Sequence, residues 1–234
     1  MPEITFPTRV EVGGYLAVPE GAGPWPGVVV LPEVFGLNDD IRGHADRLAH
    51  AGYLAVAPAI YSLRCVRQAF RDLHERRGTT FKAIEYVRAW LAGRDDCTGR
   101  VGVIGFCMGG GFALVAAPHG FAAAAVNYGE VPQDAAEVLA GACPIVASYG
   151  ARDPMARADP QAPDRLAAAL AELNIPHDVH TYPDPVGHSF MNQALPAPLG
   201  PVGKVLGMGY DAPAAEDAWE RIRAFFADHL RAPA

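Results

Sequence analysis

The sequence is poor in cysteine, and its cysteines lack the spacing of a metal or redox site. Its 234 residues contain four, Cys65, Cys97, Cys107 and Cys143, and no two of them form a CxxC pair. Zinc sites and dithiol redox centres use such pairs. We therefore expect no metal, and we expect the thiols of an intracellular chain to stay reduced and unbridged.

Targeting and membrane-spanning segments are also missing. The first residues, MPEITFPTRVEVGGYLAVPEG, include neither the basic region nor the continuous apolar region of a signal peptide. No stretch approaches the run of about 18 apolar residues that a membrane helix needs. The sequence therefore predicts a cytoplasmic protein that does not bind a membrane.

Basic tracts are absent as well. The formal net charge is −7, and nothing in the sequence resembles a lysine- or arginine-rich segment that would displace counterions from phosphates. Nucleic acid is therefore not an expected partner. An anionic small substrate stays compatible with this charge, because a local cluster of arginines can oppose the global sign.

Short apolar segments dominate what the sequence does contain. Near-continuous apolar runs predict strands at 27–32, 53–58, 101–106, 122–129, 144–150 and 177–183. Such runs are typical of a parallel sheet covered on both faces. Amphipathic patterns between them predict helices at 39–52, 79–93, 164–174 and 214–230.

The alternation of strand and helix predicts one doubly wound α/β domain over residues 1–234. Residues 10–21 are expected to add an antiparallel hairpin at one edge of the sheet. The Pro- and Gly-rich segment 195–213 is interpreted as a long loop within the domain, because the last helix must still pack on the sheet.

The most informative segment is Gly105-Phe106-Cys107-Met108-Gly109. It fits the G-x-S-x-G nucleophile turn with cysteine in place of serine, and it lies between a predicted strand and a predicted helix. Such a turn exposes the nucleophile above the sheet, and the helix N-terminus beneath the sulfur favours the thiolate. Cys107 is therefore the candidate nucleophile.

Two other roles for this segment compete with catalysis. A glycine-rich strand–turn–helix corner can bind dinucleotide phosphates, but the GxGxxG pattern is not met. A buried, inert cysteine is the more common role for any single thiol. The glycines on both sides of Cys107 favour the nucleophile.

A thiol nucleophile needs a base and a group that orients the base. In this fold they follow the nucleophile in the order acid, then histidine. Asp153 follows the predicted strand 144–150, and His188 follows the predicted strand 177–183. Asp184 competes with Asp153 but ranks second, because it follows the wrong strand. The other histidines and cysteines are expected to be non-catalytic.

Together these segments resemble the dienelactone hydrolase family. The resemblance rests on LPEVFGLN (31–38), YLAVAPAIYS (53–62), GVIGFCMGG (102–110), YGARDP (149–154) and GHSF (187–190), and its landmarks run from about residue 8 to 230. It implies an α/β-hydrolase fold with the triad Cys107, Asp153 and His188.

The resemblance also implies roles for two residues that follow the first apolar run. Glu33 would lie beside the nucleophile and accept the hydrogen bond of the resting thiol until substrate binds. Without the resemblance, Glu33 would be interpreted as a strand-end carboxylate or the partner of a helix cap. The backbone N–H groups of Val34 and Met108 would form the oxyanion hole.

Two departures from the family leave the substrate open. Asn192 stands where the dienelactone enzymes have an arginine that holds the substrate carboxylate. The segment 60–77 is unlike the usual sequence and carries several arginines, namely Arg64, Arg67, Arg71, Arg76 and Arg77. Most of them are expected on a solvated helix face. Arg64, nearest the strand end, is the candidate for contacting the substrate.

We therefore expect a cysteine hydrolase that cleaves an ester or lactone bond of a small molecule without a metal or organic cofactor. A thioesterase or a broad carboxylesterase is the alternative within the enzyme class. A non-catalytic, ligand-binding member of the fold is the alternative outside it. The protein is expected to be a monomer or a small homo-oligomer.

Overall fold

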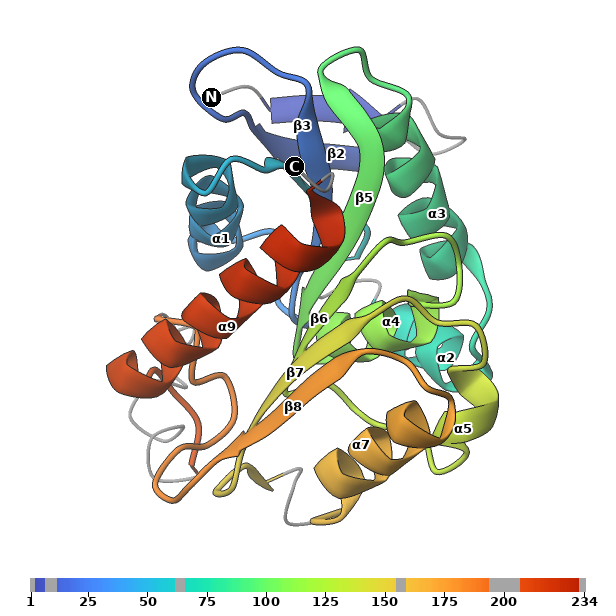
Figure 1. Cartoon of the computed structure of the whole chain (residues 1–234), viewed down its shortest axis with the longest axis vertical. Helices are drawn as coiled ribbons and strands as arrows, with labels where there is room; N and C mark the ends of the chain where they lie inside the picture. Colours follow the sequence, from blue (N-terminus) through green and yellow to red (C-terminus); the bar gives the residue numbers. More distant parts are fainter. Residues whose placement is uncertain (1–2, 7–11, 62–65, 155–158, 194–206, 232–234) are drawn as a thin grey trace.

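One eight-stranded sheet organises the computed structural model, which describes residues 3–6, 12–61, 66–154, 159–193 and 207–231 (Figure 1). Its strand order is β1-β2-β4-β3-β5-β6-β7-β8. The strands are β1 (Glu3–Phe6), β2 (Val12–Ala17), β3 (Trp25–Leu31), β4 (Leu54–Pro58), β5 (Cys97–Phe106), β6 (Ala124–Asn127), β7 (Ile145–Gly150) and β8 (His177–Tyr182).

The sheet is parallel from β4 to β8, and β1 and β2 add an antiparallel pair at one edge. This arrangement confirms all six predicted parallel strands. An antiparallel pair does lie at the predicted edge, but it joins residues 3–6 to residues 12–17, so only one of its strands falls within the predicted range 10–21. Every residue of β4 and β7 is buried, which explains why these strands read as continuous apolar runs.

Helices cover both faces of the sheet (Figure 1). α1 (Asp39–His50) and α9 (Ala212–Leu230) pack on one face, where their apolar residues join those of the strands in one buried cluster. A second cluster lies on the opposite face. The helices of that face are α2 (Val66–Glu75), α3 (Thr79–Ala92), α4 (Met108–Ala116), α5 (Ala135–Val138) and α7 (Ala162–Glu172).

Helix starts follow local capping chemistry. The Asn38 side chain accepts a hydrogen bond from the Ile41 amide at the start of α1, at 3.0 Å, and Asp211 caps α9 in the same way through Ala214. These caps satisfy amides that the first helical turn leaves without partners. The four helices predicted from amphipathic patterns, α1, α3, α7 and α9, are confirmed to within a few residues.

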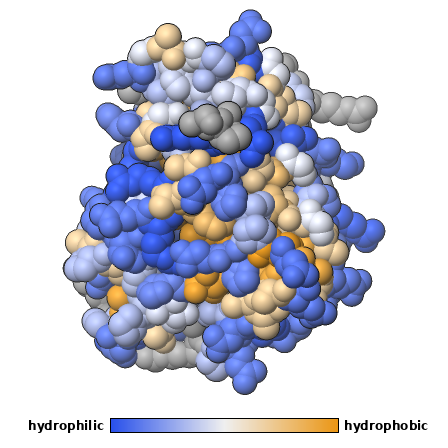
Figure 2. Space-filling view, viewed as in Figure 1, coloured by the Kyte–Doolittle hydropathy of each residue, from blue (hydrophilic) through white to orange (hydrophobic). Residues whose placement is uncertain are grey.

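The side of the molecule shown in Figure 2, which is viewed as in Figure 1, is mostly hydrophilic. Apolar side chains gather toward the middle and lower right of that view. No helix in the described part of the chain is both long and apolar enough to cross a membrane.

Of the predicted loop at 195–213, residues 195–206 lie outside the described residues. The remainder leads through a bridge between His188 and Met208 into α9.

Candidate active site

Cys107 occupies a sharp turn between β5 and α4. Its backbone has φ +54° and ψ −118°, a combination that residues with a side chain rarely adopt. Two hydrogen bonds hold the turn: the Cys107 amide donates to the Asn127 carbonyl, and the Cys107 carbonyl accepts from the Gly111 amide, both at 3.1 Å. The half-buried side chain lies at the carboxyl edge of the sheet, as the sequence predicted.

The glycines that flank Cys107 are required by close backbone contacts. A Cβ at Gly105 would lie 1.9 Å from the Gly109 carbonyl oxygen, and one at Gly109 would lie 2.4 Å from the Leu31 carbonyl oxygen. Any side chain at either position would therefore push α4 away from β5 or β3. The G-x-C-x-G spacing reflects this packing of the helix start against two strand ends.

His188 and Asp153 form a buried pair beside the turn. His188 Nδ1 lies 2.7 Å from Asp153 Oδ2, and the two residues are 3% and 2% exposed. Burial alone would lower the pKa of His188, but hydrogen bonds with Asp153 and Cys107 outweigh it and raise this pKa to about 10. The structure thus brings together Cys107, His188 and Asp153, the three residues predicted as a triad.

The two candidate acids differ in position. Asp153 follows β7 and bonds to His188, whereas Asp184 lies in an exposed turn after β8. Because parallel strands end at the same edge of the sheet, a residue after β7 can reach a histidine that lies beyond β8.

Glu33 lies two residues beyond β3 and is 2% exposed. Burial raises the pKa of its carboxyl group, and this effect is opposed by the side chains of Asn192, His188 and Asn38. Burial raises the pKa of Tyr61, and the charges of Cys107 and Glu33 raise it further. Both groups therefore act on the buried hydroxyl of Tyr61.

The thiol and the carboxylate have different surroundings in this structure. Cys107 interacts with His188, whose pKa it raises, and Glu33 Oε1 has no hydrogen-bond partner among the described residues. The hydrogen bond expected between Glu33 and the resting thiol of Cys107 is not among the interactions found, and it stays a prediction.

Asn192 connects Glu33 to two buried aromatic residues. Asn192 Oδ1 accepts hydrogen bonds from His44 Nε2 at 2.9 Å and from the Tyr128 hydroxyl at 3.2 Å. Within the described residues Asn192 Nδ2 makes no hydrogen bond, yet the amide lowers the pKa of Glu33. The amide and the carboxylate therefore interact without completing a hydrogen bond.

His44 is a neutral donor in this network. Burial lowers the pKa of His44 to about 4, so the uncharged ring donates from Nε2 to Asn192. The ring also stacks on Phe106, the residue before the nucleophile, with 4.3 Å between ring centroids and a 17° interplanar angle. His44 thus links α1 to the strand end that presents Cys107.

Neither His44 nor Tyr128 was expected near the site. A signal for His44 was available, because it lies three residues after Ile41 and four before Leu48, on the buried face of α1. A polar side chain on such a face needs a buried partner. That partner, Asn192, is remote in the sequence and could not be identified from it.

The two expected oxyanion donors lie at adjacent strand ends. Met108 is the first residue of α4, so its amide has no acceptor within the helix. Val34 is in the turn after β3, next to Glu33, and the Glu33 carbonyl of that turn accepts from the Gly36 amide at 2.9 Å. The close contact of Gly109 with Leu31 holds these two segments together.

The predicted substrate contact, Arg64, lies outside the described residues, as does Cys65. The other arginines of the segment 60–77 are exposed, as expected for a solvated face, and they are Arg67, Arg71, Arg76 and Arg77. Cys97 and Cys143 are buried, free thiols. No cluster of potential metal ligands occurs in the described ranges.

Comparison with known proteins places the chain in a family. The model of the dienelactone hydrolase family matches residues 12–230. A Yersinia pestis protein named as a carboxymethylenebutenolidase is 27% identical over 249 residues, covering 97% of this chain and 88% of its own. An Escherichia coli protein of the same name is 30% identical over 227 residues, covering 87% of this chain and 77% of its own.

Solved structures share the fold at lower identity. A dienelactone hydrolase-like promiscuous phosphotriesterase from metagenomic libraries has a TM-score of 0.80 at 23% identity, covering 98% of each chain. An esterase from Thermogutta terrifontis has a TM-score of 0.67 at 16% identity, covering 99% of this chain and 96% of that one. The α/β-hydrolase fold, the match over residues 12–230 and the curated relatives lead to one conclusion: the chain belongs to the dienelactone hydrolase family.

Proposed function

We propose that this protein hydrolyses an ester or lactone bond of a small molecule with Cys107 as the nucleophile. The observation that carries the proposal is the buried, hydrogen-bonded pair Asp153–His188 beside Cys107, which occupies a strained turn at the carboxyl edge of the sheet. A thiol, a base and a group that orients the base are the parts that covalent acyl transfer requires. The family of the chain supports the same reaction class.

In the first step, the thiol proton passes to His188 Nε2, a transfer that the raised pKa of His188 favours, and the Cys107 sulfur attacks the carbonyl carbon. Asp153 accepts the hydrogen bond of the opposite ring nitrogen and stabilises the imidazolium. The carbonyl oxygen becomes an oxyanion, which the amides of Val34 and Met108 would bind. Preorganised donors of this kind are worth about 2.7–4 kcal/mol each in the transition state.

In the second step, the tetrahedral intermediate expels the alcohol, which takes the proton from His188 Nε2. The acyl group is then held as a thioester on Cys107. His188 removes a proton from a water molecule, the water oxygen attacks the thioester carbonyl, and the sulfur leaves. The acid is released, and Cys107 recovers its proton through His188.

Glu33 would hold the thiol in reserve between turnovers. Its buried Oε1 has no hydrogen-bond partner among the described residues and is an acceptor available to a thiol. A carboxylate beside the sulfur would oppose a standing thiolate. Substrate binding would then favour the pairing of Cys107 with His188.

We place this activity in the cytoplasm, where reducing conditions keep the thiol free. The site needs no group beyond its own side chains and backbone amides. A thioesterase or a broad carboxylesterase would use the same steps on a different leaving group. Rates on matched esters, lactones and thioesters would separate these substrates.

The Cys107→Ala variant tests the proposal with p-nitrophenyl acetate as substrate. We expect turnover to fall to the rate without enzyme, with an acetylated Cys107 detectable by mass spectrometry only in the wild type. Cys143→Ala is a matched control, because this thiol is buried outside the site. A near-normal rate in Cys107→Ala would exclude the mechanism. A wild type with no activity on any ester, lactone or thioester would favour the ligand-binding alternative.

A further inference from the structure

A second feature of the carboxyl edge is a chamber of about 680 Å³ beside the triad. Asp153 and Tyr128 are part of its wall. Asp153 bonds to His188, and the ring centroids of Tyr128 and His188 are 5.0 Å apart. The chamber has the size of a small-molecule site, since such sites measure about 300–1,000 Å³.

The chamber runs along the helix that Cys107 begins. Gly111, whose amide bonds to the Cys107 carbonyl, is packed against two wall residues, Leu73 and Gly129. Val115, one turn further along α4, is also in the wall. The chamber therefore begins about one helical turn from the nucleophile and extends away from it.

Three of the charged groups on the wall, Arg76, Asp134 and Asp159, are already paired. Arg76 donates to both carboxylate oxygens of Asp134, at 2.6 and 2.5 Å, and Asp159 pairs with Arg165 at 2.6 Å. Among the described wall residues Arg76 is the only arginine or lysine. A carboxylate entering the chamber would have to compete with Asp134 for it.

Part of the buried wall of the chamber is apolar. Leu73, Val115 and Val131 are buried members of the core cluster on that face, and each is also part of the wall. The wall also contains one buried hydrogen-bond donor, the Tyr149 hydroxyl, which has no hydrogen-bond partner within the described residues. An apolar ligand fits such a lining.

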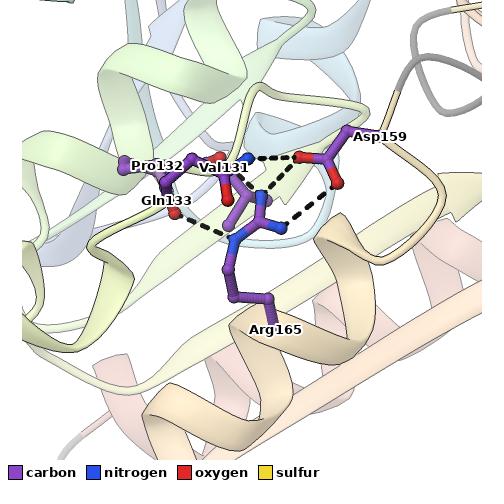
Figure 3. A network of polar contacts seen from close by, with 5 residues as sticks. All are labelled: Val131, Pro132, Gln133, Asp159 and Arg165. Atoms are coloured by element: carbon purple, nitrogen blue, oxygen red, sulfur yellow. Dashed lines mark hydrogen bonds and ion pairs between the residues drawn. The ribbon is translucent and has the colours of Figure 1, made fainter.

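One side of the chamber is held in place by Arg165 (Figure 3). This side chain donates to the carbonyls of Val131 and Pro132, at 2.9 and 3.1 Å, and to Asp159. Gln133 donates to the same carboxylate at 3.0 Å. The loop before α5 is thus fixed to the start of α7, so the chamber is preformed.

We propose that this chamber binds the apolar group of a neutral ester substrate whose carbonyl is attacked by Cys107. The proposal rests on the hydrolase function proposed above and deepens it. The expected substrates are esters that carry an apolar group larger than acetyl, with no carboxylate at the far end of that group. The group belongs either to the acyl half or to the alcohol half of the ester.

Two substrate series test the proposal and distinguish the halves. One lengthens the acyl chain of p-nitrophenyl esters from acetyl to hexanoyl, and the other enlarges the alcohol of acetate esters. In the series whose variable group binds in the chamber, we expect kcat/KM to rise by about fourfold for each methylene that becomes buried. A terminal carboxylate on the same chain should cancel the rise.

The variant Ala162→Phe should remove this rise by filling the chamber. Ala162 is a half-buried wall residue at the start of α7. Ala168→Phe, at an exposed position of the same helix outside the wall, is the control. We expect Ala162→Phe to lose the gain from the larger group, measured as the ratio of kcat/KM on the larger ester to kcat/KM on p-nitrophenyl acetate, and Ala168→Phe to keep the wild-type ratio. If Ala162→Phe does not fold, Gln133→Trp at the exposed rim takes its place.

The outcomes separate the two proposals. If Ala162→Phe and Ala168→Phe show the same substrate profile, or if the wild type prefers the carboxylate-bearing ester, the chamber proposal is overturned while the hydrolase stands. If the wild type hydrolyses neither series and Cys107 is never acylated, the proposed function itself fails.

Discussion

Gly109 lies two residues after Cys107, where the first turn of α4 passes over the end of β3. A Cβ at this position would lie 2.4 Å from the Leu31 carbonyl oxygen and 2.5 Å from that of Pro32. Real Cβ atoms essentially never come closer than 3.0 Å to such neighbours. The substitution Gly109→Ala must therefore move two backbone segments apart by at least about 0.6 Å.

This movement should cost both stability and rate. No side-chain rotation can relieve it, because both contacts are with backbone atoms, and overpacking costs about 1–3 kcal/mol even where side chains can adjust. We expect Gly109→Ala to lose about 3 kcal/mol of unfolding free energy. Leu31 and Pro32 lead directly into Val34, so the proposed oxyanion donors also separate. A displacement of this order can lower kcat/KM by about tenfold to a hundredfold.

Urea unfolding and p-nitrophenyl acetate kinetics measure the two effects. Gly43→Ala is the matched control, because a Cβ there meets nothing within 4 Å and Gly43 lies inside α1. In the interior of a helix, replacing glycine with alanine should raise the unfolding free energy by about 0.5–1 kcal/mol and leave kcat/KM on p-nitrophenyl acetate unchanged. If Gly109→Ala matches its control in stability and rate, the argument from close backbone contact is wrong.

Two further variants test the buried network and the wall of the chamber. The pKa of His44 is about 4 in the folded protein and about 6.5 in the unfolded chain, so the unfolded state binds more protons between these values. As the pH falls from 7 to 4, wild type should lose about 3 kcal/mol more unfolding free energy than His44→Gln, and equal losses in urea midpoints would contradict this. Arg165→Lys keeps the positive charge but loses the guanidinium N–H donors that bind Val131, Pro132 and Asp159. Thermal and urea unfolding should show a loss of about 1–3 kcal/mol, and an unchanged midpoint would show that the clamp is not needed.

Much of the fold follows from patterns that are local in the sequence. Apolar runs and amphipathic spacing place six strands and four helices within a few residues of their observed bounds. The largest deviation of a predicted bound is at β5, which begins at Cys97 instead of residue 101. Two smaller differences have local causes. β6 ends at Asn127, earlier than predicted, because Tyr128 has a positive φ of 43°, and α5 has four residues, too few for a helical period to show.

The grouping of the three proposed catalytic residues could be predicted because their order along the chain follows the order of the strands. Cys107, Asp153 and His188 each follow a recognisable strand, and parallel strands end at one edge. The preference for Asp153 over Asp184 came from that rule, and the hydrogen bond to His188 supports it.

The surroundings of the triad depend on contacts between distant segments. His44 and Asn192 are separated by 148 positions, and the chamber combines residues of α2, α4 and α7 with the loop before α5. Neighbours within a few residues determine helices, strands and the glycine turn, so these could be predicted from sequence. The partner of a buried side chain depends instead on how whole elements pack against one another. For that reason only the tertiary structure showed what surrounds Glu33 and what lies beside Cys107.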